Sequence, residues 1–267
     1  MAQSDIEHLP LGETSHRPSE ISLKTARRIA APVGAAGGAF MLHPEVLQPG
    51  KDAGYPGGFS YYVVGRGGVL GDVEANVVVS AFGFFAPDLI ESLWSSGVVV
   101  EGARAGADRY ATSCAAWGRA RLSAFRDVEE LESLLVRVVD SADPTGLSLF
   151  AGWQVQTRAS DVLGRCYQLI HVLRELRGSC HVVAVVAHGM SPLSAILANP
   201  GSAGVEQAER FGWKGPFPDK ESLVSTFASA EVLTDQLMAR HLDVLSATEQ
   251  GRFAQLLEEA KAILLGT

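Results

Sequence analysis

One short stretch of the sequence concentrates side chains that can do chemistry. Residues 171–192, HVLRELRGSCHVVAVVAHGMSP, contain three of the chain's seven histidines, two arginines and a glutamate. His171 and Glu175 are one helical turn apart, so their side chains can face the same ion, and His181 can approach from the next helix. His171, Glu175 and His181 are therefore a candidate metal site, with a metal ion or a haem as candidate cofactor.

The arginines of the same stretch indicate a different ligand. An arginine can hold a carboxylate through two parallel hydrogen bonds, and a histidine beside a glutamate can move a proton. We therefore predict a binding site for a small polar or anionic molecule, with catalysis as an option. Its predicted members are His171, Arg174, Glu175, Arg177 and His181, joined by His43 and Tyr62 from the first half of the chain.

A structural role for these residues is the competing hypothesis. Arg174, Glu175 and Arg177 would then form ion pairs that hold two helices together, with His171 as a buried hydrogen-bonded partner. The stretch has no second cluster of His or Cys and no metal-binding spacing such as HExxH. This favours the structural role over metal binding.

Two other short motifs do not match known catalytic patterns. GRGG at residues 65–68 lacks the full spacing of a phosphate-binding loop and is more typical of a tight turn. Ser191 is not part of a GxSxG sequence. Its position before Pro192 predicts a helix cap rather than a nucleophile.

The elements that must position these residues are mostly helical. The pattern predicts a helix over about residues 161–177 that ends at Gly178, followed by an apolar helix over residues 180–188. A short helix at residues 21–34 is expected to break near Pro32, before a long loop rich in Gly and Pro at residues 34–59.

The rest of the chain follows the same pattern. Residues 127–142 have helical apolar spacing, and Ser246 and Glu249 are spaced as a capping box. Only SYYVVG and GVVVEG resemble strands. The predicted fold class is therefore mainly α, with little β.

The chain is expected to divide into two lobes. Residues 1–20 are polar and predict a flexible arm. The turn DPTG at residues 143–146 separates a lobe of residues 21–142 from a lobe of residues 147–267. The strings YVVGRGGVLGDVEAN and VVAHGMSPLSAILAN resemble each other and indicate an internal duplication.

The composition limits the class of protein. The 267 residues are 47% hydrophobic and 19% charged, as in an ordinary globular protein. The net charge of −8 disfavours DNA as a partner, because phosphate-binding surfaces are basic. Three widely spaced cysteines without a CxxC motif predict a reducing cytoplasm, and no apolar run is long enough for a membrane span.

Several segments occur in an order that resembles one family. They are GGAFMLHPE, YYVVGRGGVLGDV, FGFFAPDLIESLW, LFAGW, HVLRELRGSCHVVAVVAHGMSPLSAIL and FGWKGPFPD. Over roughly residues 25–262 the chain resembles the actinobacterial MarR-like helix-turn-helix family of SalK/EvbL type, whose members often lie near natural-product genes. The resemblance implies two winged-helix-like lobes. It also implies a motif of the form HxxLREHRGDGH, matched by His171, Arg174, Glu175, Arg177, Gly178 and His181.

Two departures from that family bear on function. Many relatives have a histidine in an EPxHA segment where this chain reads APVG at residues 31–34. Many also have a basic recognition helix where this chain reads DKESLVSTFASAEVLTD. Between residues 60 and 100 the only basic residue is Arg66, although a helix that reads DNA bases needs basic or amide side chains on its exposed face.

The expected function follows from this loss of positive charge. We expect a cytoplasmic protein in which degenerate winged-helix lobes bind a small molecule, a metal or a cofactor, with catalysis in natural-product metabolism as an option. The alternative is a MarR-like DNA-binding transcriptional regulator that dimerises through its terminal helices.

Overall fold

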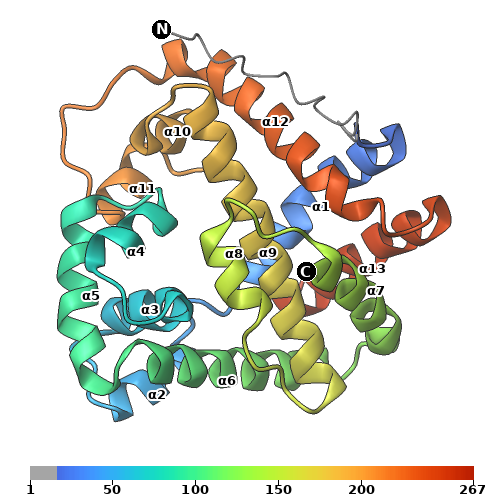
Figure 1. The fold of residues 1–267 in the computed structure, drawn as a ribbon, viewed down its shortest axis with the longest axis horizontal. Helices are drawn as coiled ribbons and strands as arrows, with labels where there is room; N and C mark the ends of the chain where they lie inside the picture. The colour runs from blue at the N-terminus through green and yellow to red at the C-terminus, as the bar shows by residue number, and fades with distance from the viewer. Residues whose placement is uncertain (1–16) are drawn as a thin grey trace, which may run out of the picture.

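One long helix, α9 (Val162–Ala187), runs through the middle of the structure and carries most of the predicted site residues (Figure 1). The structure is a computed structural model that describes residues 17–267. Asp161 begins the helix, because its side chain accepts a hydrogen bond of 2.9 Å from the backbone N–H of Gly164. Most of the predicted arm, residues 1–16, lies outside the described residues.

The described residues fold mainly into helices. The first half contains α1 (Glu20–Gly38), α2 (Pro44–Asp52), α3 (Gly58–Gly67), η1 (Gly68–Leu70), α4 (Ala75–Phe82), α5 (Pro87–Glu101), α6 (Ala103–Leu122) and α7 (Val128–Ser141). Around α9, the second half contains α8 (Ser148–Gln154), α10 (Pro192–Ala198), α11 (Val205–Arg210), η2 (Lys220–Leu223), α12 (Val224–Leu242) and α13 (Ala247–Leu265). Residues 17–267 include no β-strand, which confirms the mainly α fold class.

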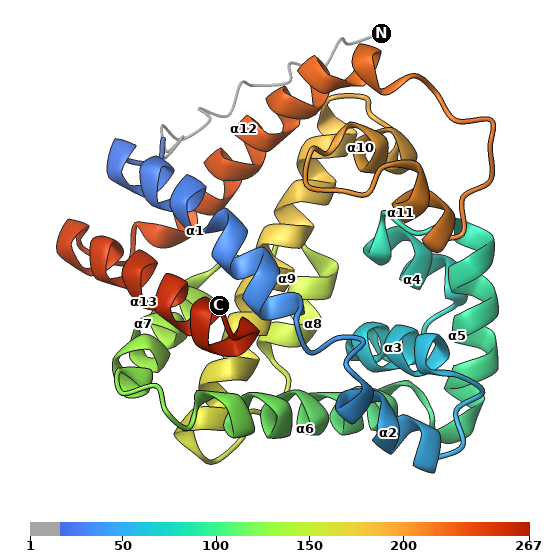
Figure 2. The same cartoon turned by 180° about the vertical axis from the view of Figure 1, so that it is seen from behind.

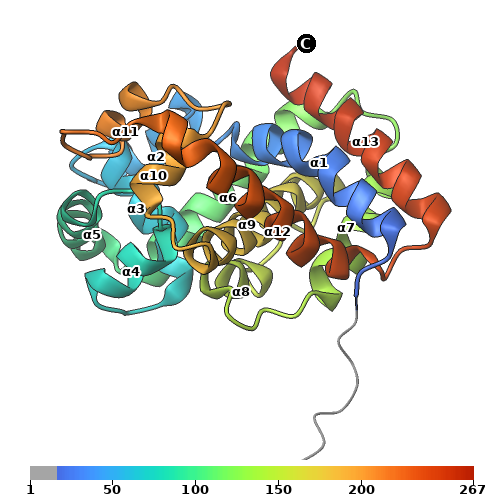
Figure 3. The same ribbon diagram turned by 90° about the horizontal axis from the view of Figure 1, so that it is seen from above.

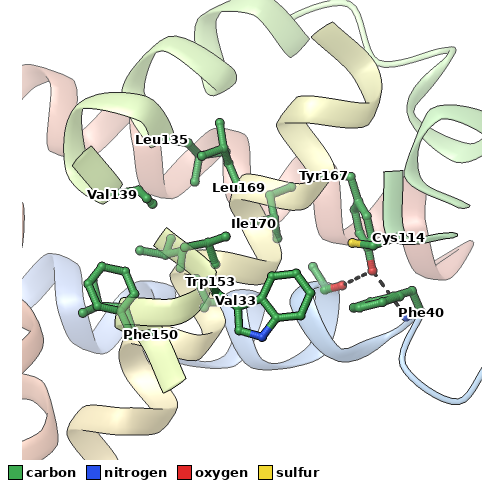
Figure 4. Packing of buried hydrophobic residues seen from close by; sticks show 14 of the residues in the cluster. Val33, Phe40, Cys114, Leu135, Val139, Phe150, Trp153, Tyr167, Leu169 and Ile170 are labelled. Atoms are coloured by element: carbon green, nitrogen blue, oxygen red, sulfur yellow. Dashed lines mark hydrogen bonds between the residues drawn. The ribbon is translucent and has the colours of Figure 1, made fainter. Parts of the chain in front are cut away.

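The helices of both halves share one main core. Helices α1, α6, α7, α8 and α12 pack on α9, and α13 lies along α1 (Figure 2). Figure 4 shows Leu169 and Ile170 of α9 packed near Leu135 of α7 and Trp153 of α8. Burial of one such aliphatic side chain stabilises the fold by about 1.5–3 kcal/mol, so these contacts hold α9 firmly in place.

The predicted boundary at residues 143–146 is a turn between α7 and α8. Asp143 stabilises it by accepting hydrogen bonds from the backbone N–H and the hydroxyl of Thr145. Helices on both sides of the turn contribute to the same core. The part of the chain that the structure describes has no β wing, and the two lobes and the internal duplication stay predictions.

Two helices continue through residues that were expected to end them. Pro32 lies inside α1 and Gly178 lies inside α9, so both predicted breaks are wrong. In each case the buried face of the helix continues past the residue of low helix propensity, with Val33 buried after Pro32 and Cys180 buried after Gly178. Tertiary packing therefore outweighs the cost of about 1 kcal/mol for a helical glycine or about 3 kcal/mol for a proline.

The predicted loop and the two predicted strands are also corrected. The loop at residues 34–59 contains α2, where the His43 ring accepts a hydrogen bond from the backbone N–H of Glu45. SYYVVG lies in α3, and GVVVEG covers the end of α5. Helix α3 is buried on nearly all sides, so its apolar run lacks the period that distinguishes a helix from a strand.

No helix within residues 17–267 is by itself both long and apolar enough to cross a membrane. Helices α9 and α10 meet that criterion only as a pair, and the pair is bent by 106°.

Viewed from above, α3, α4 and α5 lie at one end of the molecule and α7 and α13 at the other, with α9 and α12 between them (Figure 3).

Candidate functional site

A buried ion pair joins α3 to α9. Arg66 donates two hydrogen bonds to Glu175, from Nε to Oε1 at 3.0 Å and from Nη2 to Oε2 at 2.8 Å. Arg174 donates a third, from Nη1 to Oε1 at 3.0 Å. Burial by itself would raise the pKa of Glu175, but Arg66 and Arg174 lower it to about 2. Glu175 is therefore ionised at neutral pH, and two arginines share its single negative charge.

His171 lies behind this ion pair and is fully buried. Its Nδ1 lies 3.2 Å from the backbone oxygen of Gly37 and 3.9 Å from Oε1 of Glu175, and its ring contacts the edges of Phe40 and Trp153. Burial lowers the pKa of His171 to about 4, so the ring is neutral at pH 7. Nδ1 therefore donates its hydrogen to the Gly37 carbonyl, and His171 packs inside the core.

His181 belongs to a second cluster, between α9 and α12. Its Nδ1 lies 3.0 Å from Oγ1 of Thr234 and 3.1 Å from Oε1 of Glu231. Arg177 donates a hydrogen bond of 2.8 Å to the other oxygen of Glu231. His171 and His181 are separated by ten residues of one continuous helix, which corresponds to about 15 Å along its axis.

The predicted metal site is therefore not formed. Among the residues that the structure describes, no group of three His, Cys, Asp or Glu is placed to hold a metal ion. The prediction of a break at Gly178 is the cause of the error, because only a turn there could bring His181 back toward His171 and Glu175.

The two predicted site residues of the first half have different surroundings. Tyr62 lies on α3, where its hydroxyl accepts a hydrogen bond of 3.2 Å from Nη1 of Arg66. His43 lies at the start of α2, with its Nε2 at 3.4 Å from Nη2 of Arg121 on α6. Tyr62 is therefore part of the site around Glu175, whereas His43 is outside it.

A cavity of about 320 Å³ lies beside the ion pair, between α3, the turn from α4 to α5, α9, and α10 with α11. We call it the α9 pocket. Its polar wall includes three predicted residues and one that was missed: Tyr62, Arg174, His181 and Arg66. The pocket is not lined by His171, Glu175 or Arg177. The predicted binding residues therefore fall into two groups, those that line the pocket and those that lie outside it.

The charge of the α9 pocket is opposite to that of the whole protein. The chain has 30 acidic and 22 basic residues, yet within residues 17–267 two arginines and no Asp or Glu line the pocket. Glu175 compensates one of the two positive charges from behind the wall. Arg174 is 29% exposed and makes a hydrogen bond through only one of its nitrogens within residues 17–267, so its other N–H groups remain available.

The apolar lining of the α9 pocket includes four phenylalanines: Phe82, Phe84, Phe85 and Phe211. Phe211, which follows α11, stacks on Phe85 with ring centroids 4.1 Å apart. Its backbone oxygen also accepts a hydrogen bond of 2.8 Å from the N–H of Ala86. These contacts join the segment of α10 and α11 to the turn between α4 and α5 (Figure 1).

A glycine brings the turn between α4 and α5 close to α9. Gly83 has φ of 66°, a conformation that residues with a Cβ rarely adopt, and a Cβ there would lie 2.9 Å from Cγ2 of Val182. The next two residues, Phe84 and Phe85, are thereby placed in the pocket wall. Sequence reasoning missed them and also Arg66, although an arginine inside the apolar run YYVVGRGGVL is a signal for a buried ion pair.

Comparison with known proteins identifies the family. A family model described as a helix-turn-helix family matches residues 26–223, which include the pocket residues on α3, α9 and α11. A search of curated proteins gave no match. A search of solved structures gave none either. Because the family model covers well over half of the chain, the protein belongs to this helix-turn-helix family.

Proposed function

We propose that the protein binds a small organic anion in the α9 pocket. The observation that carries this proposal is the lining of the pocket, which includes Arg66 and Arg174 but no acidic residue of the part of the chain that the structure describes. An arginine whose partner is a shared carboxylate keeps N–H groups for a second anion, and such charge-assisted hydrogen bonds contribute about 1.5–3 kcal/mol.

The phenylalanines indicate the other part of the ligand. Small-molecule sites are mostly apolar with a few polar groups that set the orientation of the ligand, and a volume of about 320 Å³ is at the lower end of their range. Four phenyl rings line the α9 pocket, and Cζ of Arg66 lies over one of them, Phe82, at 4.6 Å from the ring centroid. The ligand is therefore an anion with an aromatic or other flat apolar group.

The ligand's charge can be tested without changing the protein. Phenylacetate and its neutral analogue phenylacetamide have nearly the same shape and differ in charge. In isothermal titration we expect phenylacetate to bind at least about tenfold more tightly than phenylacetamide, because only the carboxylate can accept charge-assisted hydrogen bonds from Arg174. Equal affinities for the two compounds would rule out an anion site.

The second candidate function is regulation of transcription by DNA binding, which the family match favours. Charge opposes it. Helices α4 and α5 contain no Lys or Arg, and the single arginine of α11, Arg210, donates a hydrogen bond of 2.8 Å to Glu206. A mobility shift assay with the protein's own upstream DNA tests this function. We expect weak binding at most, and salt-sensitive, sequence-specific binding would favour the regulator.

We also propose a narrower group within the helix-turn-helix family. We infer an actinobacterial, MarR-like protein of SalK/EvbL type that acts in the cytoplasm near natural-product metabolism. The three cysteines are buried and unpaired, as expected for a reducing compartment. A homodimer through the terminal helices would use the exposed sides of α12 and α13, and sedimentation analysis measures it directly.

A further inference from the structure

The hydrogen on the ring of His181 can be assigned from its neighbours. The hydroxyl of Thr234 donates its hydrogen to the backbone oxygen of Ala230 at 2.8 Å, so its oxygen acts as an acceptor toward His181. Glu231, the other neighbour of Nδ1, is a carboxylate and accepts as well. Nδ1 of His181 therefore carries the hydrogen, and Nε2 has a lone pair.

That lone pair faces the α9 pocket. Glu231 and Thr234 belong to α12, which does not line the pocket, whereas His181 does. The two ring nitrogens point in roughly opposite directions, so Nε2 is directed away from α12. Nε2 makes no hydrogen bond within the described part of the chain.

The ring of His181 is held in this orientation. Phe84 stacks on one side of it at a centroid distance of 5.4 Å, and Phe227 contacts it edge-on at 5.8 Å. Burial lowers the pKa of His181 below 6.5, an effect that Glu231 opposes and Arg177 reinforces. A neutral imidazole whose Nδ1–H is bonded to a carboxylate is the usual form of a histidine that accepts a proton.

Tyr62 supplies the complementary group on the wall formed by α3. Its hydroxyl oxygen accepts a hydrogen bond from Arg66, and its own hydrogen has no acceptor among residues 17–267. Tyr62 lines the α9 pocket and can therefore donate to an oxygen atom of a ligand. The lining of the α9 pocket thus includes a proton acceptor, a hydroxyl donor and two cations.

We propose that the α9 pocket is a catalytic centre for enolisation, in which His181 removes a proton from the carbon next to the carbonyl group of an aryl-substituted 2-oxo carboxylate. This inference rests on the proposed anion site and assigns a reaction to it. The carboxylate group pairs with Arg174, the keto oxygen accepts a hydrogen bond from Tyr62, and the aryl group contacts the phenylalanines.

The reaction balances without a further reactant. The C–H bond breaks and its proton moves to Nε2 of His181. The electron pair of that bond forms a carbon–carbon double bond, and the carbonyl π electrons move to the oxygen, whose negative charge Arg66 and Tyr62 stabilise. The imidazolium that forms pairs with Glu231, and it exchanges its hydrogen with water before returning a proton to the carbon.

Hydrogen exchange with solvent measures this reaction directly. Phenylpyruvate is the probe, and proton NMR in D₂O follows the loss of its methylene signal with and without protein. We expect the protein to accelerate the exchange. We expect His181→Gln to reduce the protein-dependent rate by about 100-fold or more, the usual contribution of a general base, while the affinity for phenylpyruvate changes less than about threefold.

His188→Gln is the matched control, because His188 lies at the end of the same helix, its ring contacts the backbone oxygen of Ala184 and it does not line the pocket. It should leave the rate unchanged. Tyr62→Phe should also lower the rate, which provides a second test if the His181 variant is unstable.

The outcomes separate the two proposals. If the wild-type protein binds phenylpyruvate without accelerating exchange, the catalytic inference is wrong and the anion site stands. If exchange is as fast in a folded His181→Gln variant, the inference is also wrong. If the wild-type protein does not bind phenylpyruvate or phenylacetate, both proposals fail.

Discussion

Replacement of Glu175 by glutamine should be one of the most destabilising single changes in the protein. The amide keeps the shape of the side chain but removes the charge that compensates Arg66, which is only 8% exposed. Loss of one partner from a buried ion pair costs about 3–5 kcal/mol. A second route gives a similar magnitude, since the fall in the pKa of Glu175 from 4.5 to about 2 corresponds to roughly 3 kcal/mol.

The dependence on pH identifies the cause of the loss. The pKa of Glu175 is lower in the folded protein, so its contribution to the free energy of unfolding is complete above pH 4.5 and is lost as the pH falls toward 2. The free energy of unfolding of the wild-type protein should therefore be about 3 kcal/mol larger than that of the Glu175→Gln variant at pH 7. The difference should shrink as the pH approaches 2.

Urea unfolding followed by circular dichroism measures this difference. Glu130→Gln is the control, because Glu130 pairs with Arg252 at the surface, where both side chains are at least 30% exposed. A surface pair of this kind contributes at most about 1 kcal/mol. The account of a buried, charge-compensated cluster is refuted if the Glu175→Gln variant loses no more stability than the Glu130→Gln variant.

Two further predictions concern the surroundings of the ion pair. Burial lowers the pKa of His171 from 6.5 to about 4, so this side chain should contribute a loss of up to about 3 kcal/mol in the unfolding free energy as the pH falls from 6.5 to 4, a contribution that His171→Leu removes in urea titrations. Gly37→Ala should lower the unfolding free energy by about 1–3 kcal/mol, because the new Cβ would lie 2.7 Å from Cβ of Arg174 and 2.9 Å from the backbone oxygen of Ile170. Gly34→Ala lies at a helical position where no atom of residues 17–267 is within 4 Å of the new Cβ, so it should not destabilise the protein. A loss equal to that of Gly37→Ala would contradict the packing argument.

The sequence predicted correctly those helices and helix caps that depend on contacts between residues close together in the chain. Residues 128–141 form α7, with the expected apolar face buried, since its period of 3.6 is clear. The capping box of Ser246 and Glu249 is present at the start of α13, and Ser191 caps α10, because these contacts involve only residues close in sequence. Elements that depend on packing against distant helices, such as α3, were predicted less well.

The candidate site illustrates the same limit. Glu175 and Arg174 were identified correctly as a charged cluster, since they lie on one helix. The partner that neutralises Glu175 is Arg66, which is 109 residues away in sequence. The apolar wall also depends on a contact between Phe85 and Phe211, so no local pattern could predict it.

The most direct test of the central claim is the affinity of the Arg174→Gln variant for phenylacetate, measured by isothermal titration. Removal of the partly exposed cation should weaken binding by about 10- to 100-fold, the equivalent of 1.5–3 kcal/mol. Arg104→Gln, an exposed change on α6 outside the α9 pocket, should leave the affinity unaltered. Equal affinity in the wild-type protein and the Arg174→Gln variant would contradict an anion site in the α9 pocket.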